Sequence, residues 1–209
     1  MQQLDEIIER IRQSLDARNA ARDQALSHAR TLTRYCSQAI RAIHREESGL
    51  AQENLEEARQ LANALRENLL PYPDLYYAGY TQDALKEFVE ASVVYALLSN
   101  ENLPGPEDLS VEDSTYLKGL AEAAGELRRK CLDILRNGHS GEAERLLNDM
   151  DEIYSALVTM DYPDALTGGL RRLTDLVRGV TERTRGDMTL SLRQEQLEQS
   201  MRRLEAKLK

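Results

Sequence analysis

Apolar residues recur along this chain at helical spacing, and the alternation that marks strands is weak. Ala, Leu, Glu, Arg and Gln dominate, and β-branched or aromatic residues never alternate with polar ones over a useful length. The prolines lie at positions 71, 73, 104, 106 and 163, so three long proline-free tracts remain. The pattern therefore predicts an all-α protein.

Capping and breaking signals divide these tracts into seven predicted helices. They run from about Gln2 to Glu47, from Ser48-Gly49 to Leu70, from about Tyr80 to Leu98, from Ser110 or Asp113 to Arg136, from the Ser140 cap to about Met160, from Asp161 and Pro163 to Arg185, and from Gly186-Asp187 to about Lys209. The fourth is expected to stop at Asn137-Gly138. Because no repeat of fixed period and no low-complexity linker is present, a single domain over residues 1–209 is the simpler interpretation.

Charge and composition narrow the function classes. The chain has 27 Lys and Arg and 36 Asp and Glu, so its net charge is −9. This charge excludes a protein that binds nucleic acid through a generally basic surface. The longest uncharged stretch, Ala91 to Asn100, is far shorter than the roughly 20 apolar residues of a membrane span. Acidic residues occur among the first residues, where a secretory signal would be apolar. Two cysteines far apart in the sequence are too few to stabilise a chain of this length by disulfide bonds. We expect a cytoplasmic, reduced protein with no membrane association.

A basic stripe marks the first predicted helix. Between Ser27 and Arg45 there is no acid, and at 100° per residue Arg30, Arg34, Arg41 and Arg45 share one face with His44 beside them. Leu32, Cys36, Ala39 and Ile43 collect on the opposite face, which is expected to pack. Arginines one and two turns apart suit the spaced phosphates of a nucleic-acid strand. A solvated face paired with acids elsewhere is the alternative, and the spacing alone leaves both open.

Two pairs of glutamates stand among apolar or small residues. Glu87 and Glu90 share a face of the predicted helix ALKEFVEASVVYALL, and Glu122 and Glu126 share one of YLKGLAEAAGELRRK. An ionised Glu in an apolar helix costs several kcal/mol unless it is paired or bound to a cation. The four acids could therefore hold Mg²⁺ or Mn²⁺, which prefer oxygen ligands. The alternative is an ion-pair network with Arg128, Arg129 or Lys130.

Other metal sites fit poorly. Three histidines and two cysteines lack the spacing of a structural zinc site. A four-helix di-iron site would need Glu-x-x-His, and neither Glu87 nor the later glutamates have a His at that spacing. Any metal should be held mainly by carboxylates.

These blocks, in this order, resemble the translin family, and more specifically its catalytic branch, the translin-associated factor X type and its prokaryotic relatives. The resemblance rests on EFVEA at 87–91, YLKGLAEAAGELRRKC at 116–131, ARTLTRYCSQAIRAIHR at 29–45 and GGLRRLTDLVRGVTERTRGDMT at 168–189. It implies a seven-helix α-superhelical bundle, a closed octamer, binding of single-stranded RNA or DNA inside it, and metal-dependent endonuclease activity.

The resemblance also implies roles for particular residues. The family's pair of catalytic glutamates falls on Glu87 and Glu90, and the later glutamate of its GEL motif falls on Glu126. At one position the chain departs, because Glu122 stands where the catalytic branch usually has Asp. The extra methylene could affect activity or metal preference, since Mg²⁺ demands near-ideal octahedral geometry.

We therefore expect a metal-dependent endoribonuclease that acts as a homo-oligomer on single-stranded or short RNA, with single-stranded DNA as a further candidate. The alternatives are a strand-binding protein without cleavage and a helical scaffold for protein partners. Tyr76, Tyr77 and Tyr80 could stack on bases, although packing within a loop is the commoner reason for such a cluster. Cys36 and Cys131 are expected in the core, and His44 at a phosphate or the surface.

Overall fold

The structure is a computed structural model that describes residues 1–136, 138 and 141–208. Within this part of the chain every regular element is a helix, so the predicted all-α class is confirmed. The chain divides into two compact units, of which the first comprises residues 1–92 and 106–111 and the second residues 93–105 and 112–209. This division does not test the prediction of a single domain. No helix in the described ranges combines the length and the apolar character needed to cross a membrane.

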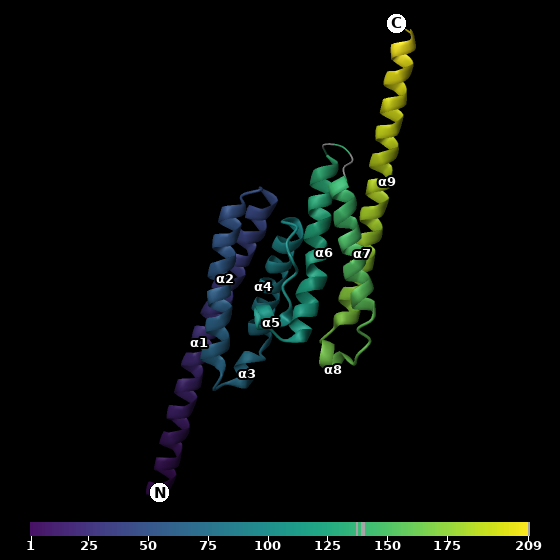
Figure 1. Cartoon of the computed structure of the whole chain (residues 1–209). Helices are drawn as coiled ribbons and strands as arrows, with labels where there is room; N and C mark the ends of the chain where they lie inside the picture. The colour runs from purple at the N-terminus through teal and green to yellow at the C-terminus, as the bar shows by residue number, and fades with distance from the viewer. Residues whose placement is uncertain (137, 139–140, 209) are drawn as a thin grey trace. The chain divides into compact units, whose positions relative to one another are not determined.

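The first unit is built on a helical hairpin. Helices α1 (Gln2–His44) and α2 (Ser48–Leu69) lie side by side and antiparallel, as Figure 1 shows. The turn between them contains Glu46, whose φ of 63° ends α1. Short α3 (Pro73–Tyr76), α4 (Gly79–Leu98) as far as Ser92, and short α5 (Pro106–Leu109) complete the unit. The predicted packing face of α1 is confirmed, because Leu32, Cys36, Ala39 and Ile43 are buried.

Only the second half of α1 belongs to this packed hairpin. Residues 1–20 are all exposed, and the first buried residue is Ala25. In Figure 1 this N-terminal part of α1, in purple, continues as a single helix past the end of α2. A long helix with an unpacked first half was not foreseen from the spacing of its apolar residues.

The second unit contains a three-helix bundle. Helices α6 (Asp113–Leu135), α7 (Gly141–Val158) and α9 (Leu170–Leu208) contact one another, and short α8 (Asp164–Thr167) precedes α9. One cluster of its core consists of Ala143, Leu147 and Met188. The predicted start of a helix at Asp113 is confirmed, whereas the expected stop at Asn137, the Ser140 cap and the end at Lys209 lie outside the described residues.

The predicted break at Gly186-Asp187 is wrong. Helix α9 is continuous from Leu170 to Leu208, so the sixth and seventh predicted helices are one. The buried stripe of α9 runs on through Thr181, Thr184 and Met188, and a single interior Gly costs only about 1 kcal/mol relative to Ala. Packing on both sides of Gly186 therefore outweighs the local signal. The break falls earlier, at Gly168 and Gly169, whose φ angles are 56° and 88°.

Candidate metal and nucleic-acid-binding residues

The predicted basic stripe is an exposed surface of α1. Arg30, Arg34, Arg41 and Arg45 are all exposed, and His44 beside them is partly buried. Their positions follow directly from the helix, because the opposite face is packed against the rest of the first unit. The Arg34 guanidinium lies 5.4 Å from the centre of the neighbouring Tyr35 ring.

None of these four guanidinium groups forms an ion pair with a carboxylate in the described part of the chain, where the ion pairs involve other arginines. The four arginines are therefore solvated in this chain, and their role in binding a strand stays a prediction. A row of unpaired guanidinium groups can donate to phosphate oxygens without first breaking an internal bond.

Glu87 and Glu90 lie on α4 in the first unit, one turn apart. Both are partly buried, while Phe88, Val89 and Ala91 between and beside them are almost completely buried. The Glu87 side chain is 30% exposed, and its Oε1 lies 3.3 Å from Nζ of Lys86. Lys86 is a neighbour that the sequence pattern did not single out. The pair thus presents two carboxylates at the edge of an apolar core, where desolvation is partial.

The buried Cys36 of α1 is influenced by the charges of Glu87 and Glu90. Burial raises the pKa of the Cys36 thiol most, and the negative charges of Glu87 and Glu90 raise it further. Burial likewise raises the pKa of Cys131 to about 11, and its Sγ lies 3.7 Å from the carbonyl oxygen of Ala143. The raised pKa values of both cysteines favour the protonated thiol at neutral pH, which is the weaker nucleophile. Their predicted place in the core is confirmed.

Glu122 and Glu126 lie on α6 in the second unit, one turn apart. Both are partly buried, and Nη1 of Arg129 lies 3.4 Å from Oε2 of Glu126. Arg129 is half-exposed and the distance is long, so this ion pair contributes little to stability. The two glutamates thus give α6 a pair of carboxylates on one face, as α4 has.

The structure also places Arg128, which was considered as an ion-pair partner of the glutamates, and the tyrosine cluster, which was considered for base stacking. Arg128 forms an ion pair with Asp187 of α9 at 2.8 Å and donates to the Thr184 hydroxyl at 3.1 Å. Arg128 therefore holds α6 against α9. The rings of Tyr76 and Tyr77 meet edge to face with centroids 5.0 Å apart, and Tyr77 is 61% exposed.

Comparison with known proteins places the chain. No family model matches it. Over 190 residues it is 30% identical to an uncharacterized protein of Methanocaldococcus jannaschii, across 90% of this chain and 84% of that protein. It is 34% identical to AfC3PO in the solved complex with duplex RNA, with a TM-score of 0.80 and coverage of 88% of this chain and 95% of that one. C3PO is the translin and translin-associated factor X type of complex. The chain belongs to the translin family.

Two further solved structures agree with this placement. A crystal structure of AfC3PO is 33% identical with a TM-score of 0.81, and covers 88% of this chain and 96% of that chain. A crystal structure of apo-NeC3PO has the same TM-score and coverage at 23% identity, and supports the fold alone. The resemblance predicted from the glutamate and arginine motifs, to the translin-associated factor X type of this family, is thereby confirmed.

Proposed function

We propose that this translin-family protein is a metal-dependent endoribonuclease that binds and cleaves single-stranded or short RNA. The observation that carries the proposal is the pair Glu87 and Glu90, two carboxylates kept partly exposed on a helix whose intervening residues are buried. Two like charges one turn apart repel each other, and partial burial weakens the screening of that repulsion by water. A cation that both bind gives the arrangement its reason.

Strand binding is assigned to the basic stripe of Arg30, Arg34, Arg41 and Arg45. Its support is the exposure of all four residues and their lack of carboxylate partners within the described chain. Its second support is the likeness, at 34% identity, to AfC3PO, which was solved with duplex RNA. We propose single-stranded RNA as the main ligand, since a flexible single strand can adapt the spacing of its phosphates to a straight row of arginines on one helix. Single-stranded DNA is a further ligand to be tested.

The donor set suits a hard divalent cation. We propose that Glu87, Glu90, Glu122 and Glu126 bind Mg²⁺ or Mn²⁺, because all four offer only carboxylate oxygens. The protonated thiols of Cys36 and Cys131 remain outside the ligand set. When bound, such a metal would activate water and stabilise the charge that develops on the phosphate.

The chain's own residues would divide the remaining work. The arginines would hold the strand by its phosphates, and holding a substrate in a fixed position can supply much of a rate enhancement. The Nζ of Lys86, 3.3 Å from Oε1 of Glu87, would hold that side chain in place beside the proposed metal site. The Glu122 side chain, one methylene longer than the usual Asp, would have to reach its place by a change of rotamer.

A binding protein without cleavage is the second candidate. The observation in its favour is that Glu126 already has a cationic neighbour in Arg129, at 3.4 Å, and that Glu122 departs from the usual residue. If these two carboxylates serve the second unit alone, Glu87 and Glu90 would offer too few ligands for a tightly held Mg²⁺. RNA would then be held but not cut.

We propose further that the protein works as a homo-oligomer, an octamer as the family resemblance implies, in the cytoplasm. In an enclosed assembly the basic stripe can face an interior while a chain with a net charge of −9 keeps an acidic exterior. The two free buried cysteines accord with a reducing compartment.

A cleavage assay on the purified protein tests the activity. Labelled single-stranded RNA, duplex RNA and single-stranded DNA of one sequence are incubated with Mg²⁺, with Mn²⁺ and with EDTA, while binding is followed in parallel. Cleavage of RNA that needs the divalent ion supports the nuclease. Binding without cleavage under every condition supports the second candidate, and an absence of both contradicts the two together.

A further inference from the structure

The unpacked first part of α1 carries an apolar stripe with nothing in the described chain to cover it. Met1, Leu4, Ile8, Ile11 and Leu15 are between 46% and 96% exposed. Their spacing of three and four residues alternates, which places them on one side of the helix. Single exposed apolar residues are ordinary, but a continuous stripe of this kind marks an interaction surface.

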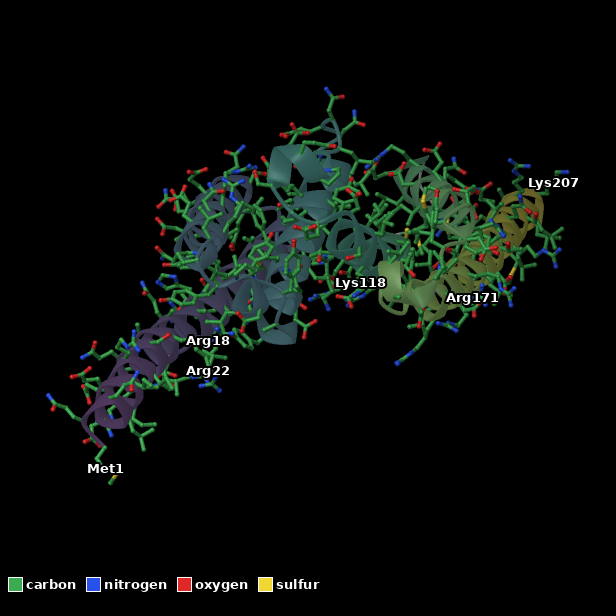
Figure 2. The ribbon with its side chains drawn as sticks, turned by 90° about the horizontal axis from the view of Figure 1, so that it is seen from below. Met1, Arg18, Arg22, Lys118, Arg171 and Lys207 are labelled. Atoms are coloured by element: carbon green, nitrogen blue, oxygen red, sulfur yellow. The ribbon has the colours of Figure 1, made fainter. Side chains whose placement is uncertain are left out.

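The stripe is a heptad repeat that continues the packed part of the same helix. Counting on from Leu15 by three and four leads through positions 18 and 22 to the buried residues Ala25, Ala29, Leu32, Cys36, Ala39 and Ile43. Arg18 and Arg22 fill the two intervening positions, and Figure 2 shows both on the part of α1 between the packed hairpin and Met1. Arg18 forms an ion pair with Asp74 of α3. The two arginines therefore separate the apolar residues of α1 that are buried within the chain from those that are exposed.

We propose that residues 1–17 of α1, the α1 arm, pair antiparallel with the α1 arm of a second copy of this chain as a two-stranded coiled coil. In this register Ile8 packs on Ile11 of the second copy, and Leu4 packs on Leu15 of the second copy, each pairing occurring twice by symmetry. A twofold pairing of one surface with itself is the commonest way in which identical chains associate. The heptad makes the seam continuous from Leu4 to Leu15.

Charge selects the antiparallel orientation. Asp5 and Arg12 are the residues that follow the core positions Leu4 and Ile11. In an antiparallel pair these flanking positions of the two copies face each other, so each Asp5 meets an Arg12 of the second copy. A parallel pair would instead set Arg12 beside Ile7 of the second copy, which offers no charge. The opposite-charge pairs stabilise one orientation and hence specify it.

The pairing is expected to depend on the folded chain. Two heptads of isolated helix are marginal in water, but the α1 arm is continuous with the packed hairpin and begins already ordered. Several arms in one assembly would add their effects. The inference does not rest on the metal or on RNA, so it stands or falls apart from the proposed activity.

Disulfide trapping tests the register. The full chain carrying both Leu4→Cys and Leu15→Cys should form a covalent dimer under mild oxidation, visible on a non-reducing gel, while each single variant stays monomeric on that gel. Eleven residues of helix separate the two positions by about 16 Å, so they cannot close within one chain. Wild-type protein controls for the buried native thiols. A linked dimer of the Leu4→Cys single variant, or no linked dimer of the double variant, would overturn the pairing.

Dissociation tests the surface. Ile8→Asp with Ile11→Asp, and separately Asp5→Arg, should raise the dissociation constant of the self-association tenfold or more in light scattering or sedimentation. Asp5→Arg leaves the apolar stripe intact and adds an attractive neighbour for Glu9, and an unchanged helical content by circular dichroism shows that the arm stays folded. Leu176→Asp, at a residue 51% exposed on α9, is the matched control. Equal association of all the variants would overturn the proposal, as would an equal weakening in the control.

Discussion

Arg145 of α7 donates from Nη2 to the carbonyl oxygen of Leu97, in the last turn of α4, at 2.9 Å. That carbonyl has no partner within its own helix, since the last turn of any helix leaves its acceptors open. The guanidinium also forms two bonds to Glu142, of 2.6 and 3.0 Å, and one to Asp149 of 2.8 Å. One side chain thereby fixes the last turn of α4 against α7 within the second unit.

We expect Arg145→Met to lower the free energy of unfolding by about 2 kcal/mol. The variant keeps the apolar stem but leaves the Leu97 carbonyl with only the longer bond from the Asn100 N–H, at 3.4 Å, and removes the donor to the Asp149 carboxylate, which is 20% exposed. Urea denaturation measures the change. Arg129→Met removes only a long, half-exposed ion pair and should stay within about 0.5 kcal/mol of wild type. An Arg145→Met protein as stable as Arg129→Met would show that the bond to the carbonyl contributes nothing.

The same cluster should govern part of the response to acid. Hydrogen bonds from Arg145 hold the pKa of Glu142 below its ordinary value, so its stabilising effect is present above about pH 4.3 and disappears as the pH falls through the lowered value. Burial raises the pKa of Asp149, whose contribution is therefore greatest at low pH and declines as the pH rises. Melting temperatures at pH 6 and pH 3.5 should converge in Glu142→Gln and diverge further in Asp149→Asn. Identical changes in both would contradict the opposed signs.

Two glycines should respond oppositely to Ala. A Cβ at Gly186 would meet nothing within 4 Å, and the residue lies inside α9, so Gly186→Ala should stabilise by about 0.5 to 1 kcal/mol. Gly168 has a φ of 56°, and a Cβ there would lie 2.5 Å from Nζ of Lys118, a residue marked in Figure 2. Gly168→Ala should destabilise by about 1 kcal/mol. Thermal unfolding of the two variants decides, and a stabilising Gly168→Ala would contradict the left-handed turn.

These glycines also show where the sequence was sufficient and where it was not. Proline positions and helical spacing predicted the all-α class and the ends of helices near Leu98 and Asp113, because those signals are local. The Gly186-Asp187 signal misled, since the buried stripe of α9 and the Arg128 to Asp187 pair hold the helix through it. Single-turn helices such as α3 were not predicted, because four residues are too few to show a helical period.

For the candidate site, the sequence predicted which helix face carries each residue, but it did not predict which side chains contact that residue. The exposure of the arginine stripe follows from the angular positions of Arg30 and Arg34 on one helix, which the sequence contains. Whether acids of the described chain reach that stripe depends on how its helices pack. The influence of Glu87 on the Cys36 thiol likewise joins residues 51 positions apart, and no local pattern shows it. The unpacked α1 arm was missed because a heptad looks the same whether its partner lies in the chain or outside it.

Removing the stripe should weaken strand binding in a salt-dependent way. We expect Arg30, Arg34, Arg41 and Arg45 replaced together by Ala to bind single-stranded RNA more weakly. The slope of log K against log salt should fall by about 0.7 for each phosphate that the variant no longer neutralises. Arg202→Ala with Arg203→Ala, on the exposed end of α9, changes charge away from the stripe and is the control. Circular dichroism should be unchanged in both, and an unaltered slope in the fourfold variant would place the strand elsewhere.

The four glutamates give the sharpest test of the proposed chemistry. Glu→Gln at position 87, 90, 122 or 126 keeps the shape and removes a negative ligand, so divalent-dependent cleavage should fall by at least a hundredfold while RNA binding and assembly persist. Glu53→Gln, at an exposed residue of α2, should change neither. Thermal unfolding without metal distinguishes a metal-ligand cluster from the alternative of structural ion pairs. A structural pair loses stability when one member is neutralised, whereas a ligand cluster does not, because crowded carboxylates repel one another.

Glu122→Asp probes the one departure from the family pattern. If position 122 binds the metal, the shorter side chain should keep or raise cleavage and leave the affinity for RNA unchanged. If Glu122 only supports α6, the same change should act through stability alone. Single-turnover cleavage at equal folded fractions, titrated separately with Mg²⁺ and Mn²⁺, distinguishes the two. Full activity in both Glu87→Gln and Glu90→Gln would remove the metal mechanism, and strand binding by the α1 stripe would then be the better account of this protein.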